Sequence, residues 1–109
     1  MSFIRFQGRV ILLHNVVSFY LDTFDNSSLN ITDKYILKLL KNSLEFPLDE
    51  IKDDAPILKN GGKIVVILNQ LNEQNNFICQ HILYKDYQDA KKEYEAALAQ
   101  LQKSSVQKN

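Results

Sequence analysis

Two apolar runs separated by a short polar segment constrain the fold of this chain more than any other feature of its sequence. Residues 63–71 and 77–84 are rich in Ile, Val, Leu and aromatic side chains, and Asn72–Asn76 between them is wholly polar. Runs of this length and composition, bounded by turn-forming residues, are typical of strands. We therefore expect them to form an antiparallel pair.

The start of the chain has the same character. Residues 3–14 and 16–21 are rich in β-branched and aromatic residues, which predicts two strands or one bent strand. Gly8 interrupts the first run and indicates a bulge or a close backbone approach. Asn60-Gly61-Gly62 tolerates positive φ and predicts a hairpin turn before residue 63, with a short strand at 56–58 preceding it.

Two segments have helical periodicity. Ile36, Leu37, Leu40 and Leu44 recur at helical spacing after a potential cap at Asn30, which predicts a helix over residues 31–45 that ends before Pro47. A second stripe begins at Tyr87 and ends at Leu101, and carboxylates at Asp86 and Asp89 favour its N-terminal end. Residues 103–109 beyond it are expected to be a frayed tail.

The order of elements, β-β-α-(β)-β-β-α, predicts an α+β fold. It has too few crossovers for a doubly wound sheet, so we expect a mainly antiparallel sheet or a small closed β-barrel with two helices. A chain of 109 residues buries roughly two-thirds of its unfolded surface, enough for one domain over residues 1–102 without a metal or a disulfide.

Charge and cysteine content exclude several classes of protein. A single Cys favours a reducing compartment, and the sequence shows neither an export signal nor a long apolar span, so we expect a cytoplasmic protein with no membrane contact. The 13 Lys and Arg balance 13 Asp and Glu. Zero net charge argues against a protein that binds a long phosphate backbone through bulk electrostatics, but it is compatible with a small basic patch.

Enzyme signatures are missing from the sequence. It has no phosphate-binding loop, dinucleotide fingerprint or paired metal-binding histidines. Cys79 and His81 share one face of a strand and are the only candidate nucleophile and base, but Cys and a His among apolar residues are more typical of a core. The cluster Asp49, Glu50, Asp53 and Asp54 lacks the ligand spacing of a calcium loop and indicates a solvated loop. We therefore expect neither catalysis, metal nor cofactor.

One strand carries the chemistry of RNA recognition. Alternation places Phe3, Arg5, Gln7 and Arg9 on one face, which offers an aromatic ring for stacking, an amide for base edges and two guanidinium groups. Lys59 and Lys63 flank the predicted glycine turn and extend this RNA-binding site if the turn lies nearby. The alternative is a solvent-facing edge strand whose charges discourage aggregation.

The whole layout resembles one known family. The opening stretch Phe3–Leu12 (FIRFQGRVIL), the single mid-chain helix, the Asn-Gly-Gly segment and the terminal helix look like the PrgU-type proteins, which are encoded with the surface adhesins of pheromone-responsive conjugative plasmids. The resemblance covers residues 1 to about 102. It implies a PUA-like β-barrel, a fold often used to bind RNA, and a role in restraining adhesin expression.

These observations give two hypotheses for function. The first is a small non-enzymatic regulator that binds RNA through Phe3, Arg5, Gln7, Arg9, Lys59 and Lys63. The second is a protein-interaction module that docks a partner, or a second copy of itself, through an exposed strand edge or the helix over Asp86–Leu101, with no nucleic-acid contact.

Overall fold

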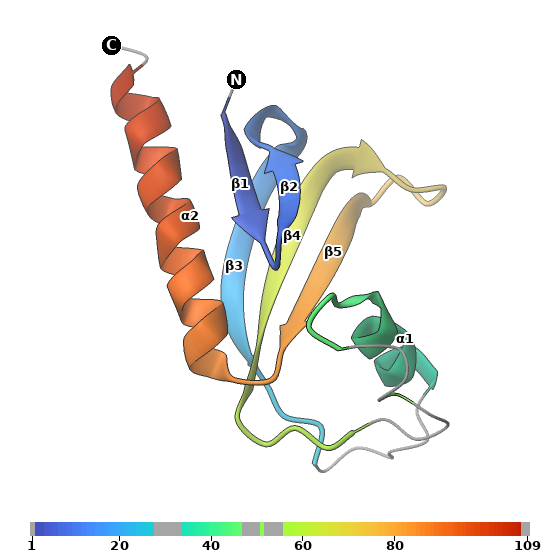
Figure 1. Ribbon diagram of the computed structural model, residues 1–109. Helices are drawn as coiled ribbons and strands as arrows, with labels where there is room; N and C mark the ends of the chain where they lie inside the picture. The colour runs from blue at the N-terminus through green and yellow to red at the C-terminus, as the bar shows by residue number, and fades with distance from the viewer. Residues whose placement is uncertain (1, 28–33, 47–50, 52–55, 108–109) are drawn as a thin grey trace.

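The computed structural model describes residues 2–27, 34–46, 51 and 56–107 of the chain (Figure 1). Two strands at the N-terminus are followed by a short 3-10 helix, a long strand, a helix, two further strands and a long terminal helix. In chain order these are β1 (Phe3–Phe6), β2 (Arg9–Leu12), η1 (Leu13–Asn15), β3 (Val16–Phe24), α1 (Lys34–Asn42), β4 (Gly61–Leu71), β5 (Phe77–Tyr84) and α2 (Tyr87–Gln107).

The centre of the fold is a three-stranded antiparallel sheet in the order β3-β4-β5. β4 lies in the middle, which is why its sequence is almost continuously apolar, with Ile64, Val65 and Val66 buried. The predicted pairing of residues 63–71 with 77–84 is confirmed, since Val65 opposes His81 and Ile67 opposes Cys79. β5 has no neighbouring strand on its other side in the described part of the chain, so it is an edge of the sheet.

The N-terminal segment folds into a separate hairpin. β1 and β2 pair antiparallel through Phe6 and Arg9, and the turn between them consists of Gln7 and Gly8, whose φ angles are +53° and +79°. Two consecutive positive φ angles are the signature of the tight hairpin turn that matches strand twist. Gly8 therefore marks neither a bulge nor a close approach, since a Cβ placed on it would meet nothing within 4 Å.

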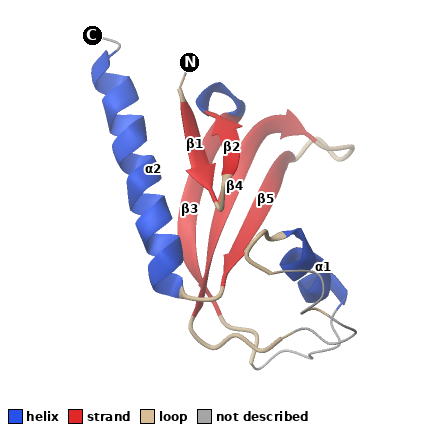
Figure 2. Cartoon of the chain, viewed as in Figure 1, coloured by secondary structure: helices blue, strands red, loops and turns tan. Residues whose placement is uncertain are grey.

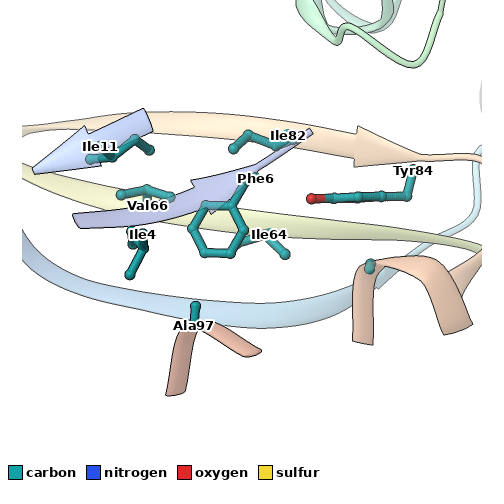
Figure 3. Close-up of a cluster of buried hydrophobic side chains, with 9 residues drawn as sticks. Ile4, Phe6, Ile11, Ile64, Val66, Ile82, Tyr84 and Ala97 are labelled. Atoms are coloured by element: carbon teal, nitrogen blue, oxygen red, sulfur yellow. The ribbon is translucent and has the colours of Figure 1, made fainter. Parts of the chain in front are cut away.

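The hairpin lies over one face of the sheet and helps to form the main core (Figure 3). Ile4, Phe6 and Ile11 are buried against Ile64 and Val66. Aromatic rings join this layer to β3 and α2, because Phe19 packs edge-to-face against Phe6 at 5.8 Å and against Tyr94 at 5.7 Å. The hairpin and α2 together cover what we call the hairpin face of the sheet (Figure 2).

The glycines at the start of β4 serve a purpose other than the predicted one. Gly61 and Gly62 pair with Phe24 and Thr23 inside the sheet, so the prediction of a hairpin turn there is wrong. A Cβ on Gly62 would come within 2.8 Å of the Ala90 Cβ and 3.0 Å of the Tyr87 Cα. The glycine therefore lets the first turn of α2 approach the sheet closely.

A second cluster covers one end of the opposite face, which we call the α1 face. Ile36 and Leu40 of α1 pack with Phe24 and Leu83. The helix ends at Asn42, three residues before the predicted end, and its predicted start at 31–33 lies outside the described residues. Residues 56–58 form no strand, although the side chain of Asn26 holds them by bonds to Leu58 N–H and Pro56 C=O.

The α+β prediction is confirmed, with two helices and mainly antiparallel strands. The two-stranded and three-stranded sheets remain separate and open within the described residues, so the structure does not show the small PUA-like barrel. α2 continues as helix past the predicted end of its apolar stripe, to Gln107. Among the described residues, neither helix has the length and apolar character that a membrane span requires.

Candidate functional site

The predicted RNA-binding residues at the N-terminus do not share one face. Phe3 and Arg5 lie on the outer face of the hairpin, where the Arg5 guanidinium carbon lies 5.3 Å from the centre of the exposed Phe3 ring. The tight turn then breaks the alternation, because Gln7 and Gly8 both belong to it. The prediction that Phe3, Arg5, Gln7 and Arg9 form one face is therefore wrong.

Arg9 lies on the opposite side of the hairpin from Arg5. Its cross-strand partner is the buried Phe6, and directly opposed residues in an antiparallel pair point to the same face. Arg9 consequently faces the sheet and lines a groove beside β5.

Gln7 is engaged within the fold. Its backbone N–H donates to both carboxylate oxygens of Glu93, at 2.9 and 3.2 Å, and its side-chain amide donates to the Leu83 carbonyl at 2.6 Å and to Glu45 at 3.3 Å. These bonds place its amide nitrogen at the edge of β5, so the amide nitrogen is not presented to a base.

The two predicted lysines lie at the other end of the sheet from Phe3. Lys59 precedes β4 and is exposed near Asp25, whereas Lys63 lies on β4 between Asp22 and Leu83. The start of β4 and the start of β1 are at opposite ends of the molecule (Figure 1). The structure therefore does not bring the six predicted residues together into one basic patch.

The interpretation of Cys79 and His81 as core residues is wrong for Cys79. Cys79 is exposed and its thiol makes only a long contact of 3.9 Å to the Phe77 carbonyl, while His81 is half-buried. Burial, with a smaller effect of nearby Lys63, lowers the pKa of His81, and its Nδ1 is buried without a hydrogen-bond partner. No hydrogen bond joins the thiol to the imidazole, so the pair lacks the contact by which a base activates a nucleophile.

Metal ligation has no support in the described ranges, which contain no group of three or more His, Cys, Asp or Glu side chains arranged to hold an ion. The acidic cluster of Asp49, Glu50, Asp53 and Asp54 lies outside the described residues.

The edge of β5 is closed at one end by side chains. Leu83 donates its N–H to the Ser43 hydroxyl at 2.9 Å and accepts at its carbonyl from the Gln7 amide, and the Lys85 N–H donates to Glu45 at 3.0 Å. Ser43 directly follows α1 and Gln7 is the hairpin turn, so two elements converge to take the place of a fourth strand. Capping of this kind is a common way to protect a sheet edge.

The next stretch of the same edge is open. In an antiparallel ladder both backbone groups of alternate residues point to the same side, and those of Leu83 point away from β4. Since the register is regular from Leu83 to Cys79, the N–H and C=O groups of His81 and Cys79 also point outward. Within the described residues no group pairs with them.

These free backbone groups lie in a groove of about 470 Å³. Arg9 borders the groove on the hairpin side, and Leu39 and Asn42 of α1 border it on the other side. Ile78 lines it as well and is 37% exposed, and the neighbouring Phe77 is 48% exposed. A bare strand edge beside exposed apolar side chains is the usual mark of a binding or aggregation site.

A carboxylate-rich junction next to this edge fixes the elements around it. The Tyr84 hydroxyl donates to Glu93 at 2.5 Å, and burial together with this bond raises the pKa of Tyr84. Burial also raises the pKa of Glu45, and the nearby carboxylates of Asp89 and Glu93 add to the effect, while the bond from Lys85 opposes it.

Comparison with known proteins gave no match to any family model, any curated protein or any solved structure. The resemblance to the PrgU-type proteins therefore stays a prediction.

The open edge predicts how β5 tolerates proline. Cys79→Pro removes an N–H that points outward, so we expect the free energy of unfolding to change by less than about 1 kcal/mol. Gln80→Pro is the matched control, because Gln80 N–H points toward β4 and its loss should cost at least about 2 kcal/mol. Urea unfolding of both variants measures the difference, and equal costs would contradict the assignment of the outward groups.

The lowered pKa of His81 predicts a pH dependence of stability. The unfolded state binds a proton more readily than the folded state, so stability is present above the ordinary value of 6.5 and decreases as pH falls through the lower folded value. His81→Gln should therefore flatten the loss of unfolding free energy between about pH 7.5 and 5.5. Urea unfolding of both proteins across this range checks it, and parallel pH profiles would contradict it.

Proposed function

We propose that this chain is a non-enzymatic protein-binding module that captures an extended segment of a partner protein as a fourth strand beside β5. The proposal rests on the backbone N–H and C=O groups of His81 and Cys79. They point outward at the floor of a groove, and no other described residue forms a hydrogen bond with them. Strand addition to an exposed sheet edge is a recurring mode of peptide recognition, in which backbone bonds hold the segment and side-chain pockets select it.

Backbone bonds alone are too weak for stable capture. His81 and Cys79 together offer two N–H and two C=O groups, each worth about 1 kcal/mol when bonded, whereas association costs at least about 4 kcal/mol. Side-chain contacts must supply the difference. The groove offers apolar surface at Leu39 and Ile78 and a guanidinium group at Arg9 for this purpose.

Hydrogen bonds within the chain fix the walls of the groove, which favours binding. Ser43 and Gln7 fix the end of α1 and the hairpin turn to Leu83, so the two walls are tied to the strand that they flank. A segment entering the groove would order mainly itself, and the entropic cost of binding is thereby reduced.

The exposed thiol also supports a cytoplasmic location. Cys79 is the only cysteine of the chain and lies at the proposed site. A free, exposed thiol persists most readily in a reducing compartment.

Selection from a displayed library of random peptides about eight residues long, the length of an ordinary strand, tests this function. Peptides enriched on the wild-type protein should bind Cys79→Pro about fivefold more weakly, because the open donor at residue 79, worth about 1 kcal/mol when bonded, is lost. Alkylation of Cys79 should also slow when such a peptide is bound. Failure to enrich any peptide, or equal binding to Cys79→Pro, would contradict the proposal.

RNA binding is a second candidate, favoured by one observation. The stacked pair of Phe3 and Arg5 lies exposed on the outer face of the hairpin, beside Val10, which is 55% exposed. An aromatic ring with a guanidinium above it is suited to stacking on unpaired bases. A regulator that restrains adhesin expression, as the resemblance to PrgU-type proteins implies, would use this face.

A gel-shift experiment with pooled cellular RNA at low salt tests this second candidate. If the outer face of the hairpin binds RNA, Arg5→Ala should weaken the shift at least about threefold and Arg9→Ala should not, because Arg9 lies on the other side. Rising salt should abolish the shift. RNA binding that is insensitive to Arg5→Ala would remove this face as the site.

A further inference from the structure

We propose that the segment captured beside β5 is acidic, with a carboxylate side chain that pairs with Arg9. This inference rests on the proposed protein-binding function and adds the chemical class of the partner. It follows from the charges around the groove and from the geometry of strand addition.

Arg9 forms no direct ion pair with a described residue, although it lies near enough to Tyr84 to oppose the rise in the pKa of that hydroxyl. Its guanidinium group has no hydrogen bond or salt bridge within the described residues, although it lines the groove beside the open backbone of β5. A guanidinium binds a carboxylate through two parallel hydrogen bonds, so an incoming acidic side chain would satisfy it.

Lysines lie on the elements beside the groove, although no described lysine lines it. The charged residues of α1 between Lys34 and Asn42 are all lysines, and Lys63 is close enough to His81 to lower its pKa. The carboxylates of Glu45 and Glu93 nearby accept bonds from Gln7, Tyr84 and Lys85. No described carboxylate lines the groove itself.

Strand geometry sets the spacing of the motif. Successive side chains of an added strand point to opposite faces of the sheet. One residue would then face Arg9 on the hairpin side and its neighbour would face Leu39 on the α1 side. The partner segment should therefore carry an acidic residue directly next to an apolar one.

A second copy of the chain is a poorer occupant. The β5 sequence FICQHILY contains no acidic residue, so pairing of β5 with β5 of another copy would give Arg9 no carboxylate from the added strand. It would also bring two cationic grooves together, which is unfavourable.

Synthetic peptides copied from the library selection test the inference. Each is made with its acidic residue and with the matching amide, and fluorescence polarisation measures binding to wild type, Arg9→Gln and Arg5→Gln. We expect the acidic peptides to bind wild type about tenfold more tightly than the amides, Arg9→Gln to remove this preference, and Arg5→Gln, on the other face of the hairpin, to keep it.

A charge reversal separates a specific effect from unfolding. Arg9→Glu should reverse the preference, so that peptides with lysine in place of the acidic residue bind more tightly than the acidic ones.

Selected peptides that carry no acidic residue, or an acidic preference that survives in Arg9→Gln, would overturn the inference while leaving strand capture intact. Failure to select any peptide that depends on residue 79 would overturn strand capture itself, and concentration-dependent dimerisation that Cys79→Pro removes would assign the edge to a second copy.

Discussion

The bond between the Gln7 N–H and the Glu93 carboxylate ties together the parts of this fold that do not follow one another in sequence. A hairpin with strands of four residues is not stable alone, yet the β1–β2 hairpin supplies Ile4 and Phe6 to the main core. Glu93 fixes the turn of that hairpin to α2. Once the turn is fixed, the Gln7 side chain reaches the Leu83 carbonyl and closes the end of β5.

In this arrangement, half-buried carboxylates accept several hydrogen bonds each. Glu93 accepts bonds from Gln7 and Tyr84, and Glu45 accepts bonds from Lys85 and Gln7. The raised pKa of Glu45 shows that desolvation outweighs the bond from Lys85. Desolvation of Glu45 therefore opposes folding, whereas the hydrogen bonds of Glu45 and Glu93 hold the hairpin, α1 and α2 around the β5 edge.

Local periodicity explains why much of the fold was predictable from the sequence. Alternating and continuous apolar runs predict β4 and β5, and the stripe that includes Tyr87, Ala90 and Tyr94 predicts α2. The errors lie where long-range contacts decide the outcome. Gln7 adopts positive φ although glutamine gives no sign of it, and Gly62 is needed for close packing on α2 rather than for a turn.

The candidate site was less predictable, because it is defined by the absence, among the described residues, of a strand paired with the outer side of β5. Sequence alternation places Arg5 and Arg9 together only if the strand continues through residue 7, and the turn separates them. Whether β5 is an edge depends on how many strands pair with it, and the closing groups at Ser43 and Gln7 come from distant segments.

The open part of the β5 edge is available both to another copy of the chain and to a segment of a partner protein. An unpaired edge beside Phe77 and Ile78 invites copies of the chain to associate, and natural sheets counter this with charge at the edge. Arg9 is the only Lys, Arg, Asp or Glu among the described residues that line the groove, so two such edges brought together would place like charges near one another. In the proposal made above, the same charge attracts a strand of opposite sign, so that Arg9 would both discourage self-association and select an acidic partner.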